Sequence, residues 1–249
     1  MKDVQYYLSV VTINYNNYYG LAKTIESIER QDYQDFEYII IDGDSNDGSP
    51  ELIRNIEKKD ARFIIEEDGG IYNAMNKGVI MSNGNYIMFL NSGDYLYSND
   101  TIRHIVSRIG CSEVIYGDIC AVRGRQKIRL KSPENIEFSS RYQHSLPPQP
   151  STIVKKDVLI SNGCFNERYK IAGDVEILSK ILIKASTSTY YLDRITTVFD
   201  ESGVSSKKRF LAMRERVEIV ARLKPAYILP LITEIACIGL KWVGRRIKQ

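Results

Sequence analysis

The chain has 249 residues, of which 43% are apolar and 26% are charged, and these are ordinary values for a globular protein. Its 16 Gly and 7 Pro are too few for a collagenous or disordered chain, and its length fits one α/β domain with an appendage. The formal charge of +3 divides into a net of −5 on residues 1–206 and +8 on residues 207–249, which predicts an acidic domain and a basic extension.

Strand-like and helix-like segments alternate in the first part of the chain. Apolar runs predict strands at residues 8–13, 36–41, 63–65 and 86–90. Helical spacing predicts helices at residues 19–31 and 71–81, with another that Ser49 caps and in which Pro50 takes the first position. This alternation predicts a mainly parallel sheet with helices on both faces.

Beyond residue 100 the pattern is weaker. It predicts helices at residues 101–108 and 175–184 and strands at residues 113–118 and 188–192. We expect the basic segment 123–131 to be irregular and the segment with Pro147, Pro148 and Pro150 to be a loop.

Polar clusters follow three predicted strands, at residues 14–16, 42–45 and 91–94. Parallel sheets bind ligands at the carboxyl ends of their strands. The run Asn-Ser-Gly-Asp at residues 91–94 fits a turn or a Mg²⁺ or Mn²⁺ site. The Asp-rich run 42–48 fits a polar turn or a contact from Asp42 to a nucleotide base. Its Asp-x-Asp start also occurs in phosphatases with an aspartyl nucleophile, which stay a weaker alternative.

Four blocks, at residues 9–16, 37–49, 68–78 and 84–94, resemble in their order the family 2 glycosyltransferases with the GT-A fold. The resemblance is closest to bacterial surface-polysaccharide enzymes of the colanic acid or capsule type. It implies an α/β, Rossmann-like GT-A domain over residues 1–206. It also implies an inverting, metal-dependent transfer of a sugar from a UDP- or GDP-linked donor. The acceptor would be a lipid-linked or growing oligosaccharide.

The resemblance also implies roles for individual residues. Thr12 and Asn14 would lie on the loop that cradles the base and the ribose, and Asp42 would read the base. The other residues implied at the donor are Asp68, Asn76 and Asn91.

The metal motif of the family usually holds three acids, and Asp94 is the carboxylate that remains here to hold Mg²⁺ or Mn²⁺. The family often has two adjacent acids at the Asp-rich turn, whereas Gly43 separates Asp42 from Asp44, so Asp44 also fits a helix-entry residue.

The catalytic base of the family is matched by Asp174, which would deprotonate the acceptor hydroxyl and which alone would fit a helix cap. Gln149 fits either a contact to the acceptor or diphosphate or a structural loop. Residues 201–205 resemble a loop that closes over the donor.

The basic extension has two interpretations, a helix packed on the core or an interfacial helix. Its apolar run is interrupted by Pro230 and Glu234 and ends with the single Trp beside a basic cluster. This pattern favours an anionic membrane surface as partner and a location at the inner face of the cytoplasmic membrane. The basic residues lack a stacking platform, which argues against nucleic acid.

Other features bear on location and on the alternative functions. The four cysteines form no C-x-x-C pair, which favours reduced thiols in a cytosolic protein. Because the first residues lead directly into a predicted strand, we expect no signal peptide. No uncharged apolar stretch reaches the roughly 18–20 residues that span a bilayer, so we expect no membrane-spanning helix. The weakened metal motif leaves a non-catalytic nucleotide or glycan binder as an alternative function.

Overall fold

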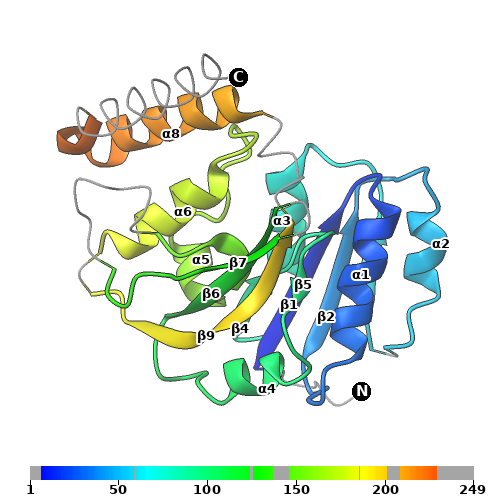
Figure 1. The fold of residues 1–249 in the computed structure, drawn as a ribbon. Coiled ribbons are helices and arrows are strands. Elements are labelled where there is room, and N and C mark those ends of the chain that lie inside the picture. Colours follow the sequence, from blue (N-terminus) through cyan, green and yellow to red (C-terminus); the bar gives the residue numbers. More distant parts are fainter. Residues whose placement is uncertain are drawn as a thin grey trace, which may run out of the picture.

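The computed structural model describes residues 7–58, 60–123, 126–136, 146–184, 186–200 and 208–228. It contains one central sheet with helices packed against it (Figure 1). The strands are β1 (Leu8–Asn14), β2 (Glu37–Asp42), β3 (Arg62–Ile65), β4 (Tyr86–Phe89), β5 (Tyr95–Leu96), β6 (Val114–Arg123), β7 (Gln126–Leu130), β8 (Thr152–Lys155) and β9 (Thr189–Asp200). The helices are α1 (Tyr18–Glu29), α2 (Ser49–Arg54), α3 (Ile71–Met81), α4 (Thr101–Val106), α5 (Lys156–Ser161), α6 (Gly173–Leu182) and α8 (Arg209–Leu223), with 3₁₀ turns η2 (Gln149–Ser151) and η3 (Pro225–Tyr227).

The sheet has the strand order β3-β2-β1-β4-β8-β6-β9-β5, and β7 pairs with β6 outside this path. The strands β3, β2, β1 and β4 are parallel, as the alternating pattern of the first part of the chain predicts. Beyond them β8 runs antiparallel to both β4 and β6, and β6 is parallel to β9. The second part of the sheet is therefore mixed.

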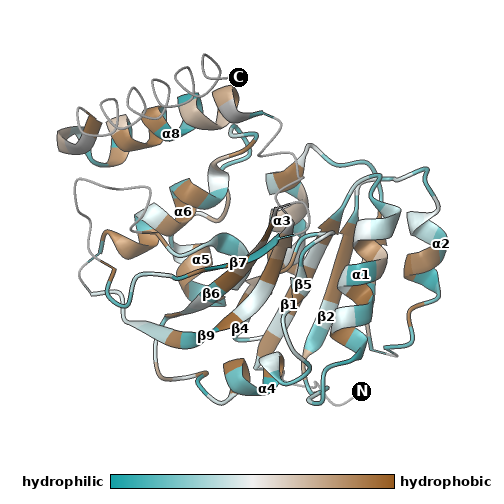
Figure 2. Ribbon diagram, in the orientation of Figure 1, coloured by the Kyte–Doolittle hydropathy of each residue, from teal (hydrophilic) through white to brown (hydrophobic). Residues whose placement is uncertain are grey.

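Two apolar layers cover the two faces of the sheet. Successive strand residues point to opposite faces, so Val11 and Ile39 pack with residues of α3 and α6. Val10 and Ile40 pack on the other face with residues of α1, α2 and α4. Figure 2 shows the hydrophobic residues along these central strands. The expected α/β fold with helices on both faces is confirmed.

The prediction of an irregular segment at residues 123–131 is wrong, because Gln126–Leu130 form β7 in a hairpin with β6. Half-buried Ile128 and Leu130 alternate with exposed charged residues, so one face of β7 packs while the other stays in solvent. Arg129 neutralises the buried Asp118 of β6 with a hydrogen bond of 2.6 Å to Oδ2. At least one basic residue of this segment therefore has a buried acid as its partner.

Local boundaries differ from the predictions in three places. Gly48 rather than Ser49 precedes α2, because its φ of 91° is a left-handed turn that glycine adopts without strain. The proline-rich segment is partly ordered as η2 and leads into β8. The last predicted strand continues to Asp200, because β9 pairs with β6 over nearly its whole length.

The start of the basic extension is helical and packs on the domain. Ile219 and Val220 of α8 are fully buried, and Ile219 joins the apolar layer that contains α6 residues. Within the described residues, none of the helices is long and apolar enough to cross a membrane. The loop predicted at residues 201–205 and the segment 229–249 lie outside the described residues.

Candidate active site

The carboxyl ends of β1, β2 and β4 meet at one edge of the sheet. Asn14 and Asp42, the last residues of β1 and β2, are register partners. The backbone N–H of Ser92 donates to the carbonyl of Ile13 at 3.1 Å, so the turn after β4 lies beside the end of β1. The three predicted polar clusters are therefore brought together.

Asp42 is buried and bonded to its neighbours. Its Oδ2 accepts from Asn14 Nδ2 at 2.7 Å and from the Ser45 hydroxyl at 2.9 Å, and its Oδ1 accepts from the Ser45 backbone N–H at 2.8 Å. With 0% of its surface exposed, the carboxylate orients the loop after β2. A nucleophile needs an accessible oxygen, so the phosphatase alternative gains no support from this geometry.

Thr12 and Asn14 lie within β1, and the expectation that they lie on a loop is wrong. Both belong to a continuous parallel ladder with β2, which keeps the backbone extended to Asn14. Thr12 is fully buried, and its hydroxyl donates to the Leu90 carbonyl at 2.8 Å. Thr12 therefore ties β1 to the end of β4 and exposes no atom to a donor.

Asp44 is exposed and has a φ of 63°, a left-handed backbone conformation that is uncommon for residues other than glycine. The helix-entry interpretation of Asp44 is wrong, because α2 begins only at Ser49. Asp47 serves the neighbouring helices instead, accepting from the backbone N–H of Tyr18 at 2.8 Å and of Ser49 at 3.1 Å. These bonds join the loops that follow β1 and β2.

Asp68 lies beside the loop that follows β2, near Asp42. A Cβ added to Gly43 would lie 2.8 Å from Asp68 Oδ2 and 3.2 Å from a ring carbon of Tyr15. Glycine at position 43 therefore permits a half-buried carboxylate and an exposed tyrosine ring to approach the same point. Asp68 Oδ1 also accepts from the Gly70 backbone N–H at 2.7 Å, which fixes the carboxylate at the entrance to α3.

Asn76 makes contacts within the protein. Its amide bonds both backbone groups of Phe165, at 2.9 Å to the carbonyl and 3.0 Å from the N–H, and donates to Glu167 at 2.8 Å. Hydrogen bonds from Asn76 and Asn73 hold the pKa of Glu167 below its usual range. Asn76 thus joins α3 to the segment that precedes α6.

The turn at residues 91–94 is held by α1. Gly93 has a φ of 104°, and the Thr24 hydroxyl accepts from its N–H at 3.1 Å and donates to the Asp94 carbonyl at 2.7 Å. Asn17 Nδ2 donates to the Ser92 carbonyl at 3.0 Å. Asn91 Oδ1 is buried without a hydrogen-bond partner among the described residues.

The described residues at this turn supply too few ligands to hold a metal ion on their own. The described residues contain no group of three or more His, Cys, Asp or Glu side chains that could hold a metal. The buried oxygen of Asn91 and the carboxylate of Asp94 are hard ligands, and Mg²⁺ binds through one or two protein oxygens plus phosphate and water. The donor set fits a Mg²⁺ or Mn²⁺ ion that a diphosphate also holds.

Asp174 is the second residue of α6 and contacts α3. Its Oδ1 accepts a hydrogen bond from the Tyr72 hydroxyl at 3.1 Å. The backbone of Gly173 contacts the same ring so closely that an added Cβ would be 2.8 Å from two ring carbons of Tyr72. Burial raises the pKa of Asp174, while the charge of Arg216 and hydrogen bonds from the Val175 backbone and Tyr72 oppose this rise. A carboxylate whose pKa lies above its usual range binds a proton more strongly than an exposed one, which suits a group that acts as a base.

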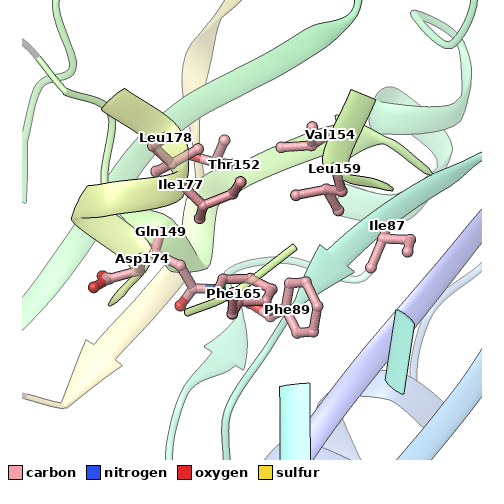
Figure 3. Close-up of a pocket in the computed structure, with 10 residues that line it drawn as sticks. All are labelled: Ile87, Phe89, Gln149, Thr152, Val154, Leu159, Phe165, Asp174, Ile177 and Leu178. Atoms are coloured by element: carbon pink, nitrogen blue, oxygen red, sulfur yellow. The ribbon is translucent and has the colours of Figure 1, made fainter. Parts of the chain in front are cut away.

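Asp174 and Gln149 lie at one end of a small pocket, with apolar side chains at the other (Figure 3). Gln149 is fixed there by a hydrogen bond of 3.2 Å from its Nε2 to the Phe89 carbonyl. Phe165 packs edge-on against Phe89 at 5.1 Å between ring centroids and stacks on Tyr72 at 5.8 Å. The aromatic rings thus form a rigid support next to the carboxylate.

Sequence reasoning missed Tyr72 as the partner of Asp174 and Tyr15 as the ring beside Asp68. Tyr72 belongs to the block 68–78, but nothing in that block shows that its hydroxyl reaches a residue 102 positions away. The glycine before Asp174 is the sequence signal that a ring or backbone approaches closely there.

Comparisons with known proteins were made by sequence and by structure. The sequence model of the family described as Glycosyl transferase family 2 matches residues 9–166. An uncharacterized glycosyltransferase of Mycobacterium tuberculosis is 27% identical over 206 residues, which cover 81% of this chain and 78% of that protein. The PGL/p-HBAD biosynthesis glycosyltransferase of Mycobacterium bovis is 26% identical over 226 residues, which cover 85% of this chain and 84% of the relative.

Solved structures resemble the fold as a whole. Residues 1–349 of S. aureus TarS match with a TM-score of 0.68 at 20% identity over 90% of this chain and 70% of that one. TarS in complex with UDP-GlcNAc matches with a TM-score of 0.67 at 22% identity over 87% and 67%. The mannosyltransferase PcManGT of Pyrobaculum calidifontis, with GDP-Man and Mn²⁺, matches with a TM-score of 0.65 at 16% identity over 92% and 68%. These likenesses confirm the predicted fold class.

Proposed function

Because the chain belongs to glycosyl transferase family 2 and has the GT-A fold, we propose that it transfers a sugar with inversion from a nucleotide diphosphate to a surface-glycan acceptor. The observation that carries this proposal is the position of Asp174, a half-buried carboxylate at the start of α6 that Tyr72 holds beside Gln149. Asp174 would take the proton of the acceptor hydroxyl as its oxygen attacks the anomeric carbon. The bond from that carbon to the diphosphate oxygen breaks in the same step.

The donor base would bind between Tyr15 and Asp68. The exposed Tyr15 ring gives a surface on which a base can stack, and the Asp68 carboxylate can accept hydrogen bonds from base N–H or ribose hydroxyl groups. Asp42 and Asn14 would anchor the loop that follows β2, since both are buried at the ends of their strands. UDP and GDP are both candidates, since neighbours of this fold were solved with UDP-GlcNAc and with GDP-Man.

The diphosphate would lie over the turn at residues 91–94. Asp94 and Asn91 Oδ1 would hold Mg²⁺ or Mn²⁺ together with the phosphate oxygens. When bound, the ion supplies positive charge against the leaving diphosphate. A neighbour with GDP-Man and Mn²⁺ supports the choice of a divalent ion.

The first test is turnover of the Asp174→Asn variant. A screen of UDP- and GDP-sugars for donor hydrolysis identifies the donor that the wild-type enzyme turns over. We expect Asp174→Asn to lose transfer and hydrolysis while calorimetry shows unchanged, Mn²⁺-dependent binding of the nucleotide. Retained turnover would exclude Asp174 as the base. Absence of nucleotide binding by the wild type would favour the alternative of a non-catalytic glycan binder.

The acceptor is proposed to be a lipid-linked or growing surface glycan of bacteria. A relative is named for the biosynthesis of PGL/p-HBAD, and another, of Bacillus subtilis, for minor teichoic acid biosynthesis. The basic composition of residues 207–249 supports contact with an anionic membrane at its cytoplasmic side.

The membrane contact is tested with a truncation that spares α8. Removing residues 229–249 leaves the buried side chains of α8 in place, whereas removing all of residues 207–249 would uncover the layer that Ile219 fills. We expect the shorter truncation to lower co-sedimentation with vesicles of phosphatidylglycerol and to leave donor hydrolysis unchanged. Equal co-sedimentation of the full chain and of the protein without residues 229–249 would exclude this segment as the membrane contact.

A further inference from the structure

The helix α8 lies against the start of α6 (Figure 1), and Glu215 is its contact with the backbone in front of Asp174. Only 6% of Glu215 is exposed. Its Oε1 accepts from the backbone N–H of Lys170 at 2.8 Å, and its Oε2 accepts from those of Ile171 and Ala172, each at 2.9 Å. One carboxylate therefore binds three consecutive backbone amides.

These amides belong to the residues that enter α6. Ala172 immediately precedes the helix, and its carbonyl accepts from the Glu176 N–H at 3.1 Å, the first bond of the helical ladder. Backbone N–H groups at the start of a helix need acceptors from outside it, and a negative charge there is favourable. Glu215 thus sets where α6 begins and how its second residue, Asp174, is presented.

Two ion pairs on the C-terminal side of Glu215 fix the rotation of α8 about its axis. Arg222 pairs with the buried Glu176 of α6, and Arg168 pairs with Glu218. Val220 is fully buried on the helix face toward the domain. These contacts fix the packing of α8 on the domain, with Glu215 toward the residues that precede α6.

We propose that α8 supports the catalytic apparatus: Glu215 is a positioning residue for Asp174, an inference that rests on the proposed role of Asp174 as base. Asp174 is held from α3 by the Tyr72 hydroxyl. On α6 itself, Glu176 is engaged by Lys180 and Arg222. The helix at the start of the basic extension therefore has a role in the reaction besides any at a membrane.

Glu215 is tested by the separation of kcat from donor binding. Glu215→Gln keeps the shape of the side chain and Glu215→Ala removes all three acceptor contacts. Arg214→Ala removes an exposed side chain from the same helix and is the control. We expect kcat for donor hydrolysis to fall about tenfold to a hundredfold in Glu215→Ala and less in Glu215→Gln, because small displacements of a catalytic group have effects of this size. Donor affinity and binding stoichiometry should stay at wild-type values.

A merely structural role of Glu215 would lower the stoichiometry of donor binding in proportion to kcat, and that result would overturn the proposal. Loss of turnover in Asp174→Asn together with a wild-type kcat in both Glu215 variants would also overturn it and leave the proposed function intact. Full turnover in Asp174→Asn would refute the proposed function itself, whatever the Glu215 variants do.

Discussion

The Tyr72 hydroxyl donates a hydrogen bond of 3.1 Å to Oδ1 of Asp174, and this contact joins α3 to α6. Burial strongly raises the pKa of Tyr72, so its hydroxyl keeps its proton and remains a donor throughout the working pH range. Because Asp174 is the acceptor, the bond favours its charged form over its neutral form. The helix α3, predicted at residues 71–81, therefore also stabilises the proposed base.

Replacing Tyr72 with Phe is expected to raise the pKa of Asp174. Burial already holds that pKa above its usual range, and removal of the hydroxyl deletes an opposing contribution. Because a base must be deprotonated, activity appears as pH rises through this pKa, so the acid limb of kcat should move to higher pH by about 0.5–1 unit. The measurement is kcat for donor hydrolysis against pH.

The control is Tyr116→Phe, which removes a tyrosine hydroxyl that donates to the Pro133 carbonyl at 2.9 Å. Its acid limb should coincide with that of the wild type. Coincident profiles for Tyr72→Phe and the wild type would show that the hydroxyl has no influence on the reacting group.

The first part of the fold could be predicted because its strands and helices follow single local patterns. The helix predicted at residues 71–81 is α3, and the strand run 36–41 is β2 shifted by one residue, since continuous apolar runs and helical spacing leave few alternatives. The segment β7 could not be predicted, because its Arg129 is explained by Asp118 and Asp193 on the other strands β6 and β9. Local composition carries no signal of such a partner.

The candidate site shows the same division between local and distant information. Asp174 is marked by its own short motif, whereas Glu215 sits 43 residues from Ala172, whose backbone it binds, inside a helix rich in charged residues. From the sequence alone, the buried carboxylate of Glu215 cannot be distinguished from the solvent-exposed carboxylates that are common on such a helix. The sequence likewise could not show whether Thr12 contacts the nucleotide-sugar donor or is buried and bonded to Leu90. That outcome depends on β4, the neighbouring strand that leads to Leu90.

Replacing Gly173 with Ala is expected to lower the free energy of unfolding by about 1–3 kcal/mol, because overpacking of a close contact has this cost. The added Cβ would lie 2.8 Å from the Tyr72 ring, which Phe165 supports from its other side by stacking. The free energy is measured by urea denaturation.

Gly69→Ala is the matched control for Gly173→Ala, since its Cβ would meet Asn73 only at 3.4 Å. Wild-type stability of Gly173→Ala would mean that the ring moves freely, and Tyr72 would then not be a rigid support for Asp174.

Replacing Asp42 with Ala is expected to destabilise the protein by about 2–4 kcal/mol, because it leaves several buried donors without an acceptor. Those donors are the Asn14 amide and the hydroxyl and backbone N–H of Ser45. Nucleotide affinity should fall as well, since the loop that carries Gly43 loses its anchor. Urea denaturation and calorimetry with UDP and GDP measure the two effects.

Asp44→Gly is the control for Asp42→Ala, because it removes an exposed carboxylate from the same loop at a φ of 63° that glycine adopts without strain. Its stability should equal or exceed that of the wild type. If Asp42→Ala lost nucleotide affinity with no loss of stability, Asp42 would instead act directly on the base.

Replacing Asn91 with Asp is expected to strengthen the Mn²⁺ dependence of nucleotide binding. Asn91 offers a buried amide oxygen without a protein partner among the described residues, and a carboxylate there would add a negative charge beside Asp94. Affinity of oxygen sites for divalent ions grows with the number of charged ligands, so UDP or GDP should bind about tenfold more tightly at a fixed Mn²⁺ concentration. Without metal the same variant should bind the nucleotide more weakly, because its added charge then repels the diphosphate.

The control for Asn91→Asp is Asn55→Asp, which places an equal charge on the exposed end of α2 and should leave both affinities unchanged. Weaker binding by Asn91→Asp both with and without Mn²⁺ would place the metal away from this turn.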